Sequence, residues 1–426
     1  MVNWKAVAVA ATSLLAGLAD AAPTTRREVS IRSSTIIKDG YIIKLKPGVT
    51  SDLEAHTLWV SNIHKRNLAK RGLDAHTYRG IERMFTGKNH FNGYAGEFDE
   101  LTIEEIRNSP DVEYVEQDRE WVLDHIEVDM SLLKDSDLVT QEGAPWGLAA
   151  ISHREPGSDE YIHAEAAGED TFAYVVDSGI RETHEQFEGR ATAAWTAFEG
   201  DNEDSDGHGT HVAGTIAGRD FGVAKKAHVL AAKVFQGASS STSIVMDGIS
   251  WAIDDVVARN RTGNAVVNLS LGGARSVLLD DLVNDGVASG VVIVVAAGNE
   301  NQPVSNVSPA SAERAITVGA INSDFEIWVD SEWKGSNFGP EIDIFAPGVN
   351  ILSAGVSSDD AEAAMTGTSM ASPHVAGLVL YAMSVDRIFG VETITERLLE
   401  NGTPDVIKGD LRESVNLLAN NGNSQQ

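Results

Sequence analysis

Three side chains in this sequence of 426 residues could together cleave an acyl bond by nucleophilic attack. They are an aspartate, a histidine and a serine, at Asp177, His208 and Ser369. A serine hydroxyl is a weak nucleophile until a base removes its proton, and a histidine oriented by a carboxylate can act as that base. Because the three residues are far apart in the sequence, this chemistry requires a fold that brings them together.

Asp177 and His208 each lie at a predicted junction between elements. Asp177 follows the apolar run Tyr174–Val176, which places it at the carboxyl end of a predicted strand. Read alone, an aspartate there is more often a turn residue or a helix cap. His208 lies in DGHGTHVAGT, residues 206–215, where glycines on both sides let the backbone carry the imidazole into a crowded site at the start of a helix.

A metal site is the alternative interpretation of the histidines. His208 and His211 are three residues apart on one helical face, so the two imidazoles could bind one ion. However, the glutamate that a zinc-protease helix requires is missing from this segment. We therefore expect His211 to be a packed histidine, and a metal hydrolase is the least favoured function.

Ser369 and Asn299 could supply the nucleophile and an oxyanion donor. Ser369 lies in TGTSMASPHVAG, residues 366–377, where Pro373 is tolerated in the first turn of a helix. This predicts that Ser369 lies at a helix N-terminus, where N–H groups and the helix dipole favour a developing oxyanion. Asn299 closes another predicted strand, and its amide could donate a second hydrogen bond. The alternatives are a capping serine and a turn asparagine.

The elements that must position these residues are short apolar strands alternating with helices from Trp146 onward. Strands are predicted at Phe172–Val176, His228–Val234, Ala265–Leu269, Val291–Ala296 and Ala315–Val318, and helices at His211–Ala217, Ser243–Arg259, Val277–Ser289 and Ser369–Met383. The run Val291–Val295 is β-branched on both faces, which indicates a parallel strand covered on both sides. We expect a layered α/β fold with an open, mostly parallel sheet and functional residues beyond the carboxyl ends of its strands.

Four segments, occurring in the order Asp177, His208, Asn299 and Ser369, carry a resemblance to a known family. Over about residues 145–415 the sequence resembles the subtilisin-like serine proteases, and within them the fungal proteinase K-like branch. The resemblance implies a three-layer subtilisin-like fold and a secreted serine endopeptidase of broad specificity that acts through an acyl-enzyme. It also implies that Asp177, His208 and Ser369 form the catalytic triad, that Asn299 holds the oxyanion, and that catalysis needs no cofactor.

The same resemblance implies how substrate and calcium would bind. Substrate-binding residues are expected at Ser270, Leu271, Gly272, Gly273, Ala297 and Gly298. A peptide paired through its main chain suits an enzyme that accepts many sequences. The second substrate segment of the family is Gly-Ser-Gly, from which Gly237–Ser241 departs. Asp343 matches the carboxylate that holds a structural calcium in this branch, and a surface carboxylate without a metal is the alternative.

Sequence patterns in the N-terminal third of the chain predict that the protein is exported and that it inhibits itself. Lys5 followed by the apolar run Ala6–Ala19 and a small-x-small pattern predicts a signal peptide, residues 1–21, and therefore an extracellular protein. Residues 39–122 mix strands at Tyr41–Leu45, Tyr94–Phe98 and Val112–Glu116 with a helix at Thr102–Asn108, as a small α+β domain would. By resemblance this domain is an inhibitory propeptide, residues 123–142 form a linker containing the maturation cleavage, and residues 143–426 form the catalytic domain.

The charge and cysteine content of the sequence limit the kinds of binding partner and chemistry that we expect. The net charge is −30, and residues 141–426 contain 16 Lys and Arg against 41 Asp and Glu. Such a surface repels nucleic acid and anionic membranes, so we expect neither as a partner. The resemblance implies protein or peptide substrates and the chain's own propeptide as an intramolecular inhibitor, and we expect a monomer. The absence of cysteine excludes disulfides, thiolate zinc sites and a cysteine nucleophile.

A non-enzymatic alternative is a binding or inhibitory protein that retains this fold without turnover. Loss of catalysis usually accompanies loss of a triad member, whereas Asp177, His208, Asn299 and Ser369 are all present. The sequence therefore favours an active endopeptidase.

Overall fold

The computed structural model describes residues 36–46, 53–74, 77–86, 91–122, 126–128 and 142–423. The predicted signal peptide and most of the predicted linker lie outside these residues. We call residues 36–122 the N-terminal domain and residues 142–423 the large domain.

A nine-stranded sheet forms the centre of the large domain. Its strands are β6 (Phe172–Asp177), β7 (Ala191–Thr196), β8 (His228–Lys233), β10 (Ala265–Leu269), β12 (Val292–Ala296), β14 (Ile316–Ile321), β17 (Ile344–Pro347), β20 (Thr403–Pro404) and β21 (Leu417–Leu418). Their order is β20-β21-β17-β14-β12-β10-β6-β8-β7, and every neighbouring pair is parallel except β20 with β21. The prediction of a mostly parallel sheet is confirmed.

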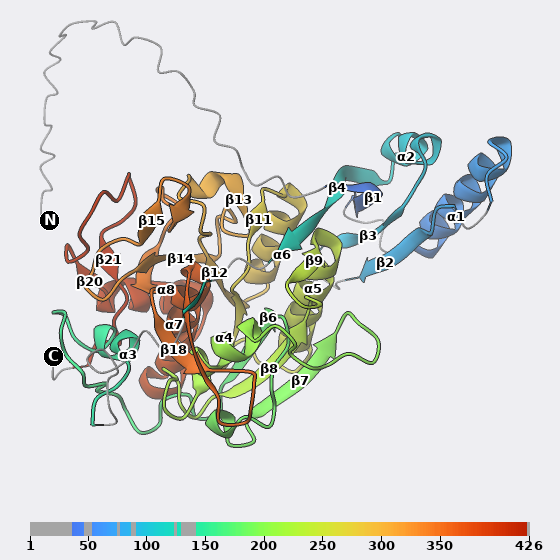
Figure 1. Ribbon diagram of the computed structural model, residues 1–426. Helices are drawn as coiled ribbons and strands as arrows, with labels where there is room; N and C mark the ends of the chain where they lie inside the picture. The colour runs from blue at the N-terminus through green and yellow to red at the C-terminus, as the bar shows by residue number, and fades with distance from the viewer. Residues whose placement is uncertain are drawn as a thin grey trace, which may run out of the picture. The chain divides into compact units, whose positions relative to one another are not determined.

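Helices cover both faces of this sheet (Figure 1). They are α3 (Trp146–Ala150), α4 (His208–Ala217), α5 (Thr242–Ala258), α6 (Val277–Ala288), α7 (Thr368–Tyr381) and α8 (Val391–Asn401). Because side chains alternate along a strand, Val292 and Val294 of β12 share a core with α4 and α7, whereas Ile293 and Val295 share another with α5 and α6. The result is the expected three-layer α/β fold.

The N-terminal domain is an antiparallel sheet with two helices. Its elements are β1 (Ile36–Leu45), α1 (Leu53–Lys70), β2 (Gly80–Thr86), β3 (Asn92–Glu97), α2 (Glu100–Arg107) and β4 (Val112–Val122), and the sheet order is β2-β3-β1-β4. On β1, Ile43 and Leu45 belong to a core that includes Val60 of α1, whereas Ile42 joins the core built around α5. One face of this sheet is therefore buried against its own helices and the other against the large domain.

Two elements of the N-terminal domain were not predicted, and two are longer than predicted, since β1 begins at Ile36 rather than Tyr41. The buried positions of α1 include His56, His64 and Asn67 alongside apolar residues, so the 3.6-residue period is hidden when only apolar residues are considered. Strand β2 was also missed. Strand β4 continues past Glu116 to Val122 because its end pairs with the large domain.

Shorter elements lie between these, among them two 3₁₀-helices at Glu185–Phe187 and Val304–Asn306 and several further strands. The strands are β5 (Ile126–Val128), β9 (Ser239–Ser241), β11 (Gly273–Ala274), β13 (Val307–Ser308), β15 (Val329–Ser331), β16 (Lys334–Gly335), β18 (Ile351–Ala354) and β19 (Glu362–Thr366), and a π-helix (Ala382–Asp386) follows α7. Within the residues described, no single helix is long and apolar enough to cross a membrane. The segments Thr368–Asp386 and Val391–Asn401 meet that criterion only as a pair bent by 102°.

Candidate active site

Asp177 and His208 are in contact. Asp177 is the last residue of β6 and His208 the first of α4, and both side chains are fully buried. The Nδ1 atom of His208 lies 2.8 Å from Oδ1 and 3.0 Å from Oδ2 of Asp177. Because an ionised carboxylate can only accept hydrogen bonds, Nδ1 carries the proton, and Nε2 of the neutral ring is the nitrogen that can act as a base.

Glycine permits the close approach of α4 to the end of β6. A Cβ atom on Gly209 would lie 2.2 Å from the carbonyl oxygen of Gly179, a distance that no side chain could tolerate. This contact explains why glycine follows His208 in a helix that must begin directly beside Asp177.

Neighbouring carboxylates set the basicity of His208. Burial disfavours the imidazolium and lowers the pKa of His208, but the charge and hydrogen bond of Asp177 act in the opposite direction. The charges of Asp206 and Asp204 add to this effect, and the pKa of His208 is raised overall. The ring is thereby a stronger base than an ordinary histidine.

Asp204 organises the loop before α4 and was not predicted from the sequence. Its Oδ1 accepts hydrogen bonds from Ser178 Oγ and Gly207 N, each at 2.8 Å, and its Oδ2 accepts from Thr210 N at 2.9 Å and Thr210 Oγ1 at 2.6 Å. It therefore ties the end of β6 to the first turn of α4. An aspartate four residues before a helix start was the available signal.

Ser369 is the second residue of α7, so its N–H lies in the first turn, where a helix offers no internal acceptor. Ser369 is 6% exposed, and its hydroxyl donates to the Ser270 carbonyl oxygen at 3.2 Å. Helices α4 and α7, which begin beside His208 and Ser369, pack against each other.

The predicted place of Pro373 was wrong, although Ser369 does lie at the helix start. Pro373 is the sixth residue of α7 and lies inside the helix, where its missing N–H would have bonded to the Ser369 carbonyl. The Ser270 hydroxyl donates to that carbonyl instead, at 2.8 Å. Ser270 in turn accepts from Asn268, which accepts from Ser372, so a polar network that was not predicted from the sequence joins β10 to α7.

The hydrogen bonds of Asn299 fix the direction of its amide. Thr368 N and Thr368 Oγ1 both donate to the same side-chain atom of Asn299, each at 2.8 Å, so that atom must be the oxygen. The NH₂ group is then on the other side, near Gly367, where a Cβ would lie 3.3 Å from Nδ2. This orientation presents donors to the start of α7.

Apart from the Asp–His pair, most of the predicted site residues lie in one cleft, and three lie outside it. Six predicted site residues line one cleft, Ser369, Asn299, Gly298, Ser270, Leu271 and Gly272. Gly273 pairs with Ser308 in the small sheet β11–β13, and Ala297 packs in a core with Phe345. Asp343 precedes β17, where Oδ2 accepts from Thr317 N at 2.7 Å.

The other histidines of the motifs have structural partners. His211 is buried, and its Nε2 lies 2.8 Å from the Ile351 carbonyl oxygen, to which it can only donate. His374 is also buried, with Nδ1 at 2.8 Å from the Met370 carbonyl oxygen, and burial lowers the pKa of His374 to about 4. Across the part of the chain that the structure describes, no three His, Cys, Asp or Glu residues are grouped to hold a metal.

The end of β4 adds an antiparallel strand to the large domain. Glu120 lies opposite Ser241 and Val122 opposite Ser239 on β9. The last three residues of the segment Gly237–Ser241 thus form an edge that pairs with an extended chain, although the segment lacks Gly-Ser-Gly.

Two acidic side chains of β4 cap helices of the large domain. Asp118 Oδ1 accepts from Ser243 N at 3.1 Å in the first turn of α5, and Glu116 Oε2 accepts from Leu278 N at 3.4 Å in the first turn of α6. Negative charge is favoured at these helix ends. Burial is the main cause that raises the pKa of both carboxyl groups.

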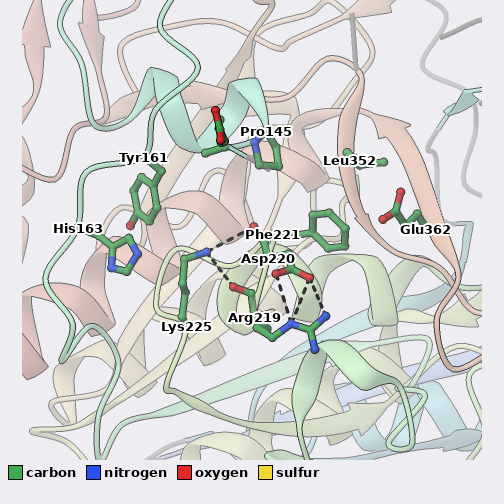
Figure 2. Close-up of a pocket in the computed structure, with 12 residues that line it drawn as sticks. Pro145, Tyr161, His163, Arg219, Asp220, Phe221, Lys225, Leu352 and Glu362 are labelled. Carbon is green, nitrogen blue, oxygen red and sulfur yellow. Dashed lines mark hydrogen bonds and ion pairs between the residues drawn. The ribbon is translucent and has the colours of Figure 1, made fainter. Parts of the chain in front are cut away.

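A separate pocket of about 520 Å³ contains none of the predicted site residues (Figure 2). Tyr161 and Lys225 lie on one side, and Leu352 of β18 and Glu362 of β19 lie on the other (Figure 2). The Nζ atom of Lys225 donates to the Arg219 carbonyl oxygen at 3.1 Å, and burial lowers the pKa of Lys225 to about 8.

Comparison with known proteins identifies the family. A model of the subtilase family matches residues 168–419, and a model of peptidase inhibitor I9 matches residues 40–124. Alkaline protease 1 of Aspergillus clavatus is 49% identical, over 92% of this chain and 93% of that protein, and the alkaline proteinase of Hapsidospora chrysogena is 48% identical, over 91% and 90%. The crystal structure of a cold adapted subtilisin-like serine proteinase matches with a TM-score of 0.58 and 35% identity, covering 66% of this chain and 98% of that chain. The chain belongs to the subtilase family of serine proteases and contains an I9 inhibitor domain before its protease domain.

Proposed function

We propose that the large domain is an endopeptidase in which Ser369 is the nucleophile and His208 the general base. His208 Nε2 takes the hydroxyl proton as Ser369 Oγ attacks a peptide carbonyl, and Asn299 Nδ2 with the Ser369 N–H stabilises the oxyanion. His208 then protonates the departing amine, and water hydrolyses the acyl-enzyme. The observation that carries this proposal is the buried contact between Asp177 and His208, which assigns the proton to Nδ1.

The hydroxyl of Ser369 must rotate before attack. It donates to the Ser270 carbonyl in this conformation, so the O–H bond must turn away from that carbonyl, by rotation about the Cβ–Oγ bond, before it can point to His208. Such a turn exchanges one hydrogen bond for another and is compatible with fast turnover.

We infer that the N-terminal domain is the inhibitor in a secreted, monomeric precursor. Support comes from the β4–β9 pairing, the two helix caps, and the ion pairs Lys44–Asp281 at 2.8 Å and Arg83–Asp247 at 2.9 Å. Secretion is supported by the signal-like sequence of residues 1–21 and by the similarity to fungal alkaline proteases.

We also propose that Asp343 binds a structural calcium ion. Burial raises the pKa of Asp343 to about 6, opposed only by the hydrogen bond from Thr317 N. A hard oxygen ligand whose charge is poorly compensated fits a Ca²⁺ site completed by main-chain carbonyls, such as those after Pro309. With a single carboxylate the site would be of low charge, and its role would be stability rather than chemistry.

A phosphonylating serine reagent tests the catalytic proposal. The secreted protein should lose casein hydrolysis as the label appears on the peptide that contains Ser369. Ser369→Ala should give an inactive, uncut precursor that remains folded by circular dichroism. Hydrolysis that survives labelling but stops with a chelator would instead favour a metal hydrolase, and a folded, unlabelled, inactive protein would favour the binding-protein alternative.

A further inference from the structure

The residue that holds the oxyanion in the proposed mechanism, Asn299, lies on a loop without regular structure. Residues 297–302 follow β12 and belong to no helix or named strand. Two of them, Gly298 and Asn301, have positive φ angles of 97° and 53°. Glycine and asparagine tolerate this left-handed region, but a loop that passes through it has few hydrogen bonds of its own. Its shape must therefore come from contacts with another segment.

Asn337 supplies those contacts from the segment that follows β16. Its side-chain Oδ1 accepts from Glu300 N at 3.1 Å and from Gln302 N at 3.0 Å. Its Nδ2 donates to the Ala297 carbonyl oxygen at 2.9 Å and to Glu300 Oε2 at 2.7 Å. A side-chain amide has two acceptor positions and two donor hydrogens, so all four are used. All four partners lie in residues 297–302.

The loop is wrapped closely around this amide. Asn337 is fully buried, and a Cβ atom on Gly298 would lie 2.3 Å from its Nδ2 atom. Main-chain bonds continue the contact, because Gly335 N donates to the Asn299 carbonyl oxygen and Asn337 N to the Gly298 carbonyl oxygen, each at 3.0 Å. The backbone of Asn299 and the residues on both sides of it are therefore bonded to one short segment, residues 335–337.

The amide of Asn299 is fixed from a different element. Its oxygen accepts both bonds from Thr368, the first residue of α7, which precedes Ser369. Thr368 thus sets the direction of the amide, whereas Asn337 sets the course of the main chain that carries it. Both are needed to place the Asn299 donor, because a misplacement of about 1 Å can cost about 100-fold in rate.

We propose that Asn337 is a positioning residue for the oxyanion donor. Asn337 is fully buried and does not line the cleft that contains Ser369 and Asn299, so it acts on turnover by holding the loop of Asn299. This inference rests on the proposed role of Asn299 in stabilising the oxyanion, and it adds a residue that the sequence motifs do not include.

A double-mutant cycle tests whether Asn337 acts through Asn299. Asn337→Asp keeps the size of the side chain and an acceptor for the two loop N–H groups, but it removes both donors and places a second carboxylate against Glu300. Wild type, Asn337→Asp, Asn299→Ala and the double variant are matured completely, and the phosphonylating reagent counts active sites, so that kcat on a peptide amide refers to folded enzyme. We expect Asn337→Asp to lower kcat about 10- to 100-fold with little change in KM. In the Asn299→Ala background the same change should alter kcat less than about twofold.

The cycle separates this inference from the proposed function. Equal losses in both backgrounds would overturn the inference, because Asn337 would then act independently of Asn299, while the normal loss in Asn299→Ala would leave the proposed function intact. A change confined to KM would also overturn it, since Asn337 would then act on the cleft through Glu300, which lines it. If Asn299→Ala alone leaves kcat unchanged, the proposed oxyanion role is wrong and the inference falls with it.

Two further variants control for a general loss of stability. Asn337→Ala removes all four side-chain bonds and should show the same fall in kcat and the same coupling to Asn299, so the test does not depend on one variant folding. Asn421 is also buried, and it donates to the Ile162 carbonyl oxygen at 2.7 Å, away from the residues that line the cleft. Asn421→Ala should lower Tm but keep kcat per active site. A comparable fall in kcat for Asn421→Ala would show that the loss reports destabilisation alone, which would overturn the inference.

Discussion

At the scale of single residues, hydrogen bonds that hold the fold determine which atoms remain for chemistry. Asp177 engages Nδ1 of His208, which leaves Nε2 as the base. Thr368 uses the oxygen of Asn299, which directs the NH₂ group elsewhere, and Ser270 takes the place of the N–H that Pro373 lacks. Each side chain of the site is therefore oriented by a structural contact before substrate binds.

Asn299 should contribute to turnover through its NH₂ group alone. Asn299→Asp keeps an oxygen for Thr368 but removes both donors, and Asn299→Ala removes the anchor as well. Both should lower kcat about 10²–10³-fold with little change in KM, the loss already known for the oxyanion asparagine of subtilisin. Steady-state kinetics on a peptide amide measures this, with Thr368→Ser as the control that keeps the Asn299 contact. A loss confined to KM would contradict the role.

At the scale of elements, the sequence predicted those helices and strands whose residues favour that structure locally. It did not predict the elements and boundaries that depend on contacts with distant parts of the chain. Strand β10 lies where its apolar run predicted, at Ala265–Leu269. Helix α4 begins at His208 rather than His211 because Asp204 caps it from outside the helix. Helix α1 was missed because its buried face includes His56 and Asn67. The positions of Asp177 and Ser369 followed from local motifs, whereas the Asn268–Ser270–Ser372 network depends on contacts between distant segments.

The contact between β4 and helices α5 and α6 is acidic on both sides. When the two domains are in contact, burial is the main cause that raises the pKa values of Glu116, Asp118 and Asp247. Burial also raises the pKa of Asp280 to about 6, and the charge of Glu116 contributes to this rise. The basic groups nearby, Arg83, Arg119 and Arg275, act in the opposite direction. Where separation of the two domains re-exposes these carboxyl groups to water and returns their pKa values to the ordinary range, association takes up protons. Binding of the N-terminal domain should be tightest below the ordinary carboxyl pKa, weaken as pH rises to about 6, and stay weak above it.

Glu116→Gln should therefore strengthen inhibition above pH 6. The change keeps an oxygen that can accept from Leu278 N, but it removes the negative charge of Glu116, which repels the negative charge of Asp280. We expect casein activity to appear several-fold more slowly than in wild type at pH 8, with little difference near pH 4.5. The ratio of the two rates at each pH cancels the titration of His208, which both proteins share. Glu120→Gln, on the exposed part of β4, is the control, and a ratio that does not vary with pH would count against this coupling.

At the scale of the whole molecule, two bodies share one hydrophobic core. Ile42 and Phe85 of the N-terminal domain belong to the same cluster as Met246 and Ile249 of α5. With no cysteine in the sequence, the mature enzyme must retain its fold without disulfides once this contact is lost.

Calcium removal should test the contribution of Asp343 to that stability. In mature enzyme inactivated by the serine reagent, excess EDTA at pH 8 should lower Tm by about 2–5 °C. Asp343→Asn should show a lower Tm and no response to EDTA, whereas Asp330→Asn, an exposed change, should respond like wild type. Because Ca²⁺ binds the ionised carboxylate, the response should fade as pH drops through about 6. An equal EDTA response in Asp343→Asn would place the calcium elsewhere.

The pairing of β4 with β9 has a consequence for the time after the cut. Before cleavage the N-terminal domain is tethered to the cleft, so its local concentration is fixed and dilution cannot weaken the inhibition. A single hydrolysed bond turns the same contact into an equilibrium between two separate chains, governed by mass action. A concentrated sample would then remain largely self-inhibited, and spreading into a larger volume would by itself switch the enzyme on.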